Sequence, residues 1–205
     1  MNFSTITVKN IESSQADGYN ILFIFTDQER YFHQLPQGLT LPAHERLQQT
    51  GITFHNHYTS AVMCTSSRSV LLTGLSTTVN GMFENTNAPY VPNLSTDIPT
   101  YGHLLRKSGY YTAYKGKWHL NRKFDSANKP VNLTKVMDNY GFSDYDYYDP
   151  GDIIGHTLGG YLHDNLVAGS AIRWLRNRGR VLNDDNKPWC LTVSLVNPHD
   201  VMYFN

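Results

Sequence analysis

Residues 63–74 (MCTSSRSVLLTG) place a thiol, several hydroxyls and a guanidinium at the start of a segment with helical character. Cys64 precedes a predicted helical turn or more over Ser66–Thr73, and Gly74 is a residue type that commonly ends helices. A helix N-terminus favours an anion, because its first N–H groups are free and its dipole is positive there. Arg68 lies one turn further on, and its planar fork fits a tetrahedral oxyanion. The segment therefore predicts a nucleophile, Cys64, that attacks a phosphate or sulfate ester.

Two other interpretations of this cysteine are weighed. A thiol phosphatase loop would place its arginine at the position of Val70, so the spacing argues against that class. A buried structural cysteine before an apolar helix is the commonest fate of a free cysteine. The second cysteine, Cys190, lies in the apolar run Trp189–Val196 and is predicted to be a packing residue.

Further polar residues follow apolar runs that have the character of buried strands. These are Asp27 and Gln28 after Tyr19–Thr26, Lys117 and His119 after Tyr110–Tyr114, and His199 after Trp189–Val196. In an open parallel sheet, ligands bind beyond the C-terminal ends of the strands. We therefore expect these side chains to gather at one edge of the sheet, although each by itself is also compatible with a turn, surface or structural residue.

The elements that position these residues alternate between strands and helices, which predicts an α/β fold with a mostly parallel central sheet flanked by helices. Residues 1–18 read as a polar N-terminal tail, and residues 19–205 as one domain. Besides the runs above, we predict helices at Pro42–Thr50, Pro99–Ser108 and Leu162–Arg178, a strand at Ile52–Tyr58 and an ordered loop at Asp138–Gly160. The residues available for the buried side of the longest helix are Leu166, Ile172, Trp174 and Leu175.

Composition excludes some partners. Lysine plus arginine number 17, as do aspartate plus glutamate, so no net charge favours nucleic acid or an acidic membrane surface. The apolar runs are too short to span a bilayer, and the first residues lack an apolar signal core. Two cysteines make no disulfide framework. A cytoplasmic protein is the expectation.

Four motifs together resemble the sulfatase family of the alkaline-phosphatase superfamily. Its signature is Cys-x-Pro/Ala-Ser-Arg followed by a Leu-Thr-Gly stretch, and this chain has CTSSR at 64–68 and LTG at 72–74. The segment GKWHL at 116–120 resembles the family's Gly-Lys-Trp-His-Leu element, with Asn121 in place of the glycine that follows. Asp27-Gln28 and Pro198-His199 resemble two shorter elements. One departure is Ser66, which stands where the family usually has proline or alanine.

The resemblance implies a fold, an activity and a set of roles. It implies a sulfatase-like α/β fold and hydrolysis of a sulfate monoester through a formylglycine hydrate, made from Cys64 by a formylglycine-generating enzyme. It implies a divalent metal, Ca²⁺ before Mg²⁺ or Mn²⁺. The implied catalytic residues are Cys64, Arg68, Lys117, His119 and His199, the substrate-binding residues are Asn85, Lys117 and His199, and the metal ligands are Asp27, Gln28 and Cys64.

The family's later metal-binding element is missing from the sequence. No Asp-His-Gly or Asn-His-Gly occurs in the 205 residues, so we expect a partial catalytic domain over 19–205 that is incomplete at the C-terminus. Such a sheet would leave an apolar edge exposed, with Trp189–Val196 lacking a neighbour. Two alternatives stay open: a phosphonate or phosphodiester hydrolase of the same superfamily, and a non-catalytic remnant.

Overall fold

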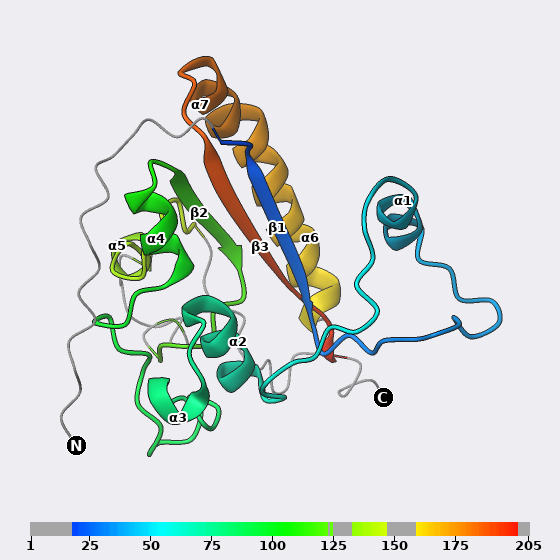
Figure 1. The fold of residues 1–205 in the computed structure, drawn as a ribbon, viewed down its shortest axis with the longest axis horizontal. Helices are drawn as coiled ribbons and strands as arrows, with labels where there is room; N and C mark the ends of the chain where they lie inside the picture. The colour runs from blue at the N-terminus through cyan, green and yellow to red at the C-terminus, as the bar shows by residue number, and fades with distance from the viewer. Residues whose placement is uncertain (1–17, 123, 125–132, 147–158, 201–205) are drawn as a thin grey trace.

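A computed structural model describes residues 18–122, 124, 133–146 and 159–200. Three parallel strands form the sheet in the order β1 (Ile21–Asp27), β3 (Trp189–Pro198) and β2 (Tyr111–Gly116) (Figure 1). The three predicted apolar runs that form them are confirmed as strands, as is the α/β class. The last strand in sequence is the central one, so the expectation that Trp189–Val196 would lack a neighbour is wrong.

One face of the sheet is covered by α6 (Gly159–Trp174), which continues through a π-helical turn, η1 (Leu175–Gly179), into α7 (Arg180–Asp184) (Figure 1). Its buried residues include Val167, Ala171 and Trp174, which pack against β3. Trp174 was expected on this side, but Leu166 and Ile172 are each 49% exposed. Val167, Ala171 and Trp174 face the sheet, whereas the side chains of Leu166 and Ile172 lie outside that contact.

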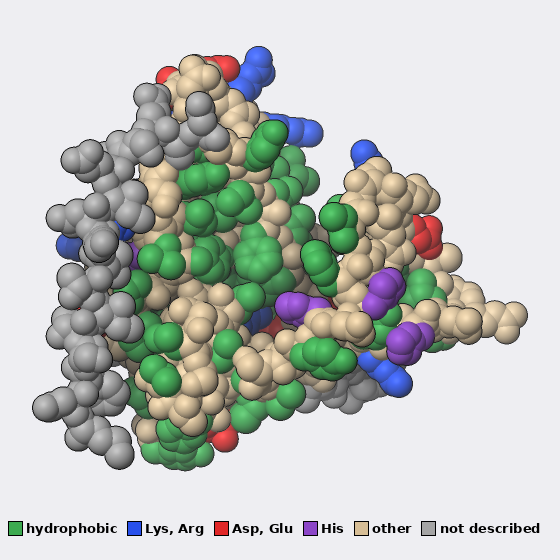
Figure 2. Space-filling model, viewed as in Figure 1, with side chains coloured by type: hydrophobic (Ala, Val, Ile, Leu, Met, Phe, Trp, Pro, Cys, Tyr) green, Lys and Arg blue, Asp and Glu red, His purple; other side chains and the backbone are tan. Residues whose placement is uncertain are grey.

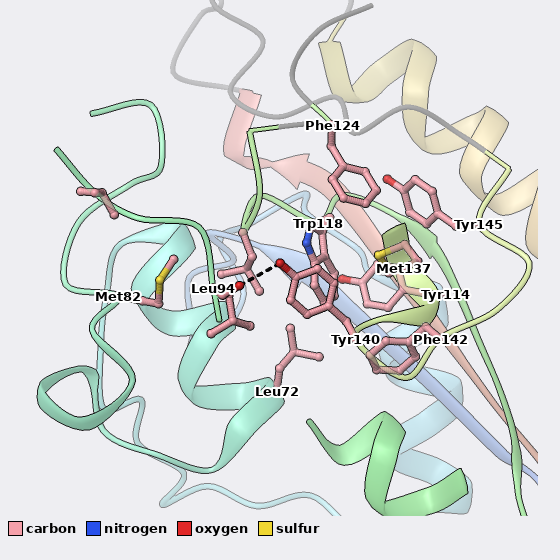
Figure 3. Close-up of a cluster of buried hydrophobic side chains, with 12 residues drawn as sticks. Leu72, Met82, Leu94, Tyr114, Trp118, Phe124, Met137, Tyr140, Phe142 and Tyr145 are labelled. Atoms are coloured by element: carbon pink, nitrogen blue, oxygen red, sulfur yellow. Dashed lines mark hydrogen bonds between the residues drawn. The ribbon is translucent and has the colours of Figure 1, made fainter. Parts of the chain in front are cut away.

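The opposite side holds α2 (Cys64–Thr73), α3 (Thr77–Asn80), α4 (Tyr101–Lys107) and α5 (Leu133–Asp138), around an aromatic core. Figure 3 shows this core, in which Trp118, Tyr140 and Phe142 lie side by side. The Tyr140 hydroxyl donates to the Leu94 carbonyl at 2.8 Å, so its polar end is satisfied inside the cluster. The core fixes the segment that carries Lys117 and His119.

The strand β1 lies at an open edge in the described part of the chain. It was predicted to be buried on both faces, which is wrong here: Leu22 is 47% and Ile24 54% exposed. The two residues are in register with Leu191 and Val193 of β3, which α6 covers, but the helix does not reach across to β1. Figure 2 shows hydrophobic side chains gathered over this strand.

Residues 28–62 form an arm that stands away from the sheet and contains α1 (Pro42–Thr50) (Figure 1). No residue of the arm is buried. The helix was predicted, but the predicted strand at Ile52–Tyr58 is wrong, because none of the strands in the described residues lies beside this segment to complete its hydrogen bonds. Most of the loop predicted at Asp138–Gly160, residues 147–158, lies outside the described residues, as does nearly all of the tail at 1–18. No helix in the described ranges has the length and apolar character needed to cross a membrane.

Candidate active site

The ends of two neighbouring strands bring Asp27 and His199 to the same edge of the sheet. Asp27 ends β1 and is in register with Pro198 of β3, and His199 is the next residue. Asp27 is buried although β1 is largely exposed. The predicted gathering of polar groups at the carboxyl ends of the strands is confirmed for this pair.

The helix α2 begins at Cys64, two residues before the predicted start. It ends at Thr73 and is capped by Gly74, which has a left-handed backbone (φ 68°) and whose N–H donates to the Val70 carbonyl at 2.8 Å. At the other end, the Thr65 N–H donates to Asn85 Oδ1 at 3.0 Å, which satisfies one of the free N–H groups of the helix start. Cys64 is therefore held in the first turn of a well-capped helix.

Asp27 pairs with two buried cations. Its Oδ2 lies 2.7 Å from Lys117 Nζ and 2.9 Å from Arg68 Nη2. Burial alone would raise the pKa of the Asp27 carboxyl, but the positive charges of Arg68 and Lys117 outweigh it and hold this pKa well below its ordinary value. Asp27 is thus a carboxylate at neutral pH.

The thiol of Cys64 lies beside this charge cluster. It donates to Asp27 Oδ1 over 3.6 Å, and Lys117 Nζ donates to Cys64 Sγ over 3.8 Å. The sulfur thus lies at a helix start, next to an ammonium group and a carboxylate. An oxyanion built at this atom would meet a cation and the positive end of the helix dipole.

The guanidinium of Arg68 points into the protein, and the residue is only 5% exposed. Its Nη1 donates to the Lys117 carbonyl and to Ser194 Oγ, each at 2.8 Å. Its Nη2 donates to Asp27, and the group lies 5.2 Å above the Phe25 ring. In this structure the fork that the sequence assigned to an oxyanion binds the Asp27 carboxylate, the Lys117 backbone carbonyl and the Ser194 hydroxyl.

The turn after β2 buries Lys117 and His119 completely. His119 has a left-handed backbone (φ 54°), and its Nε2 lies 2.7 Å from Asn87 Oδ1. The Thr65 hydroxyl donates to the His119 carbonyl at 2.8 Å, which ties this turn to the start of α2. Two segments that are 54 residues apart in sequence are thereby fixed to each other.

His199 is buried and has an acidic neighbour. Its Nδ1 lies 3.1 Å from Asp200 Oδ1, and the other oxygen of Asp200 accepts the N–H of Gly160 at the start of α6. Nearby, the two oxygens of Asp164 accept the N–H groups of Val196 and Asn197. Burial raises the pKa of Asp164. These bonds fix the end of β3 against α6.

A comparison with known protein families adds a second line of evidence. The family model described as Sulfatase matches residues 19–205, which takes in the whole site. The chain belongs to the sulfatase family. The resemblance that the sequence motifs carried is confirmed.

This sulfatase chain also resembles individual proteins. It is 33% identical over 202 residues to a choline-sulfatase of Rhizobium meliloti, covering 88% of this chain and 38% of that protein. It superimposes with a TM-score of 0.59 and 26% identity on a protein solved with its substrate D-glucosamine-2-N,6-O-disulfate, covering 88% and 35%. A phosphonate monoester hydrolase of Agrobacterium radiobacter shares the fold, with a TM-score of 0.61, 19% identity and coverage of 89% and 41%. The chain spans little more than a third of the length of these relatives.

The metal expected for a sulfatase finds only part of its ligands here. No group of three or more metal-ligating His, Cys, Asp or Glu side chains occurs within the ranges that the structure describes. Asp27 supplies one hard carboxylate, but two cations share it, and Gln28 is an exposed residue with a left-handed backbone (φ 58°). A divalent ion prefers about six oxygen ligands. The described residues fit one side of such a site and do not complete it.

Sequence reasoning missed three residues that bind the candidate site residues. Thr65 and Asn87 fix the turn at His119, and Ser194 receives Arg68. Ser194 carried a signal, since it is a polar residue inside the apolar run of β3. Asn87 carried none, because an asparagine in a loop segment is common.

Proposed function

We propose that this protein hydrolyses a sulfate monoester, with Cys64 converted to formylglycine as the nucleophile. The supporting observation is the position of the Cys64 sulfur, at the start of α2, 3.8 Å from Lys117 Nζ and 3.6 Å from Asp27 Oδ1. Once formed, the hydrated aldehyde supplies one hydroxyl for attack on sulfur and a second whose deprotonation expels sulfate. A serine or an unmodified thiol would stay sulfated, so this chemistry explains a cysteine at the position.

Lys117 and Arg68 have different tasks in this proposal. The Lys117 ammonium lies beside the reacting atom, where it offsets negative charge on the nonbridging oxygens of the ester. Arg68 binds the Lys117 backbone carbonyl and the Asp27 carboxylate, and that carboxylate in turn binds the Lys117 ammonium. Preorganised charges of this kind need no rearrangement during the reaction.

The histidines and Asn85 complete the proposal. His199 donates a proton to the leaving oxygen from Nε2, since its Nδ1 faces the Asp200 carboxylate. His119 and Asn85 bind the ester group beside the start of α2, where each already has a hydrogen bond that fixes it. A divalent ion, Ca²⁺ before Mg²⁺ or Mn²⁺, would use Asp27 and the exposed Gln28 and would add positive charge.

Two relatives support a proposal for the substrate class. One is a choline-sulfatase, and another was solved with a sulfated glucosamine. We therefore propose a small organic sulfate ester, with choline sulfate and an amino-sugar sulfate as the first two to test. A formylglycine-generating enzyme is the proposed partner for maturation. The cytoplasmic location stays a prediction.

The decisive experiment is mass spectrometry of the tryptic peptide 47–68, after co-expression with a formylglycine-generating enzyme. We expect the mass of formylglycine at residue 64. In parallel, aryl sulfate hydrolysis is measured for the wild type, Cys64→Ala and Cys190→Ala. We expect turnover to vanish in the first variant and to persist in the second. An unconverted cysteine, together with equal rates for Cys64→Ala and wild type, would refute the proposal.

A second candidate is a phosphonate or phosphodiester hydrolase, and the shared fold with a phosphonate monoester hydrolase favours it. These esters and a sulfate monoester carry the same single negative charge, so the cations of the site do not separate them. The two candidate functions are distinguished by the ratio of kcat/KM for an aryl sulfate to kcat/KM for an aryl phosphonate. We expect sulfate to be preferred by about tenfold or more, and the reverse preference would favour the second candidate.

A further inference from the structure

Ser194 lies in the middle of the central strand and is completely buried. In β3 it is in register with Phe25 of β1 on one side and with Gly116 of β2 on the other. Phe25 carries the ring beneath the Arg68 guanidinium, and Gly116 immediately precedes Lys117. Ser194 is therefore the point at which the three strands and the two cations of the site meet.

Both polar groups of Ser194 bind the cationic residues. Its hydroxyl accepts from Arg68 Nη1 at 2.8 Å, and its carbonyl accepts from the Lys117 N–H at 3.1 Å. Arg68 Nη1 also donates to the Lys117 carbonyl at 2.8 Å. Ser194 thus binds the N–H of Lys117 directly. It binds the carbonyl of Lys117 indirectly, through the Arg68 guanidinium that its hydroxyl contacts.

The close approach of the two strands at this point requires a glycine. Gly116 has a left-handed backbone (φ 92°), and a Cβ there would collide with the Ser194 carbonyl oxygen. This turn ends β2 and directs the next residue, Lys117, toward Asp27. The position of Lys117 therefore depends on Ser194 in two ways. The Ser194 backbone contacts the turn at Gly116 and Lys117 directly, and the Ser194 hydroxyl acts through Arg68.

We propose that Ser194 is a positioning residue for Arg68 and Lys117, and through them for the reacting group at Cys64. The inference rests on the proposed sulfate-ester hydrolysis for its catalytic meaning. Ser194 acts through its hydroxyl, which fixes one orientation of a guanidinium whose other acceptors include the Lys117 carbonyl and the Asp27 carboxylate. Without that acceptor a buried donor loses a partner, and the guanidinium is held by fewer fixed points.

The chain offers a matched control two residues earlier. Thr192 is also fully buried in β3 and lies on the same face of the sheet, because side chains alternate along a strand. Its hydroxyl lies 2.5 Å from the Tyr101 hydroxyl, on α4. Thr192→Val and Ser194→Ala therefore each remove one buried hydroxyl from the same strand, and only the second touches Arg68.

The test measures the exchange of the Arg68 Nη protons with water by NMR, in the 205-residue chain and without substrate. Arg68→Lys identifies the resonances by their loss. We expect Ser194→Ala to speed exchange by about tenfold or more and Thr192→Val to leave it within about twofold. Ser194→Cys is the second variant, since it keeps the size of the side chain but offers a weak acceptor. Unchanged exchange in the folded Ser194 variants, or equal acceleration in Thr192→Val, would overturn the proposal.

Kinetics of aryl sulfate hydrolysis supply the functional arm. We expect Ser194→Ala to lower kcat by about tenfold and to change KM less, because the orientation of the cations matters most as charge develops. A wild-type kcat in Ser194→Ala would show that Ser194 has no positioning role in the reaction. If wild-type protein bearing formylglycine hydrolyses no sulfate ester while Ser194→Ala still frees Arg68, the proposed function fails and the positioning of Arg68 stands.

Discussion

The carboxylate of Asp27 neutralises the ammonium of Lys117 across 2.7 Å, with both side chains almost fully buried. The same oxygen also receives Arg68, so one anion serves two cations. Asp27→Asn would leave both cations without their counter-charge in a poorly solvated place. We expect a loss of about 3–5 kcal/mol in the free energy of unfolding at pH 7, measured by urea titration.

The pH dependence of that loss has a definite sign. The pKa of Asp27 is lowered in the folded protein from 3.8, so its stabilisation is complete above that value and falls as the pH drops through the folded-state pKa. The stability gap between wild type and Asp27→Asn should stay constant from pH 7 to about pH 4 and narrow below it. Asp146→Asn is the control, because Asp146 also pairs with two cations but has a side chain that is 42% exposed. Its substitution should therefore lower the free energy of unfolding by less than Asp27→Asn does. A gap that narrows near neutral pH would contradict the assignment.

Arg68→Lys should damage the protein far more than Arg178→Lys. The Arg68 fork makes hydrogen bonds to a carbonyl, a hydroxyl and a carboxylate, which a single ammonium cannot reproduce. Arg178 is exposed and lies 4.8 Å over the Tyr111 ring. We expect Arg68→Lys to cost about 2 kcal/mol of stability and more than about tenfold in turnover. A loss of turnover below about threefold, matching the control, would sink the prediction.

The two cysteines should differ in reactivity. Cys190 is 2% exposed, and burial raises the pKa of its thiol to about 11. Cys64 is partly exposed at the start of α2. In protein expressed without the modifying enzyme, brief treatment with iodoacetamide should label Cys64 and spare Cys190, because the thiolate is the reacting form. Peptide mass spectrometry checks this, and prior labelling of Cys190 in folded protein would contradict the burial seen here.

Ser66→Ala should stabilise the protein. The Ser66 hydroxyl is buried, and no hydrogen-bond partner for it occurs among the described residues. Removing an unsatisfied buried hydroxyl recovers its desolvation cost, so we expect a gain of about 1 kcal/mol by urea unfolding. Ser69→Ala is the matched control on the same helix, because the Ser69 hydroxyl donates to the Ser66 carbonyl at 2.8 Å and accepts from Asn80. Destabilisation by Ser66→Ala would mean that its hydroxyl has a partner.

The open edge of β1 should make the 205-residue chain prone to association. Ile24 is 54% exposed on a strand that pairs on one side only in the described structure. Ile24→Lys should raise the concentration at which the chain stays monomeric, measured by light scattering, because a charge on an edge strand blocks pairing. Its stability should change by less than about 0.5 kcal/mol, whereas Val193→Lys, inside the α6 contact, should unfold the chain. Unchanged association of Ile24→Lys would show that this edge is not responsible.

The sequence by itself determined the three strands and the helices α1, α2, α4 and α6, and it named most of the candidate site residues. Continuous apolar runs predicted the three strands, and the Cys64-to-Gly74 segment predicted α2, because apolar runs and glycine at a helix end are local properties of the sequence. The motifs also identified Cys64, Lys117 and Asp27, which the fold brings into contact.

Only the tertiary structure decided which strands pair and which side chains of the site bind one another. The central place of β3, the exposure of β1 and the absence of a strand at Ile52–Tyr58 depend on which strands pair, and no local pattern encodes that choice. The bond from Arg68 to Ser194 joins residues 126 positions apart. Such a contact forms because the strand register and the packing of α2 bring the two residues together. Local sequence patterns do not specify contacts between residues so far apart in the chain.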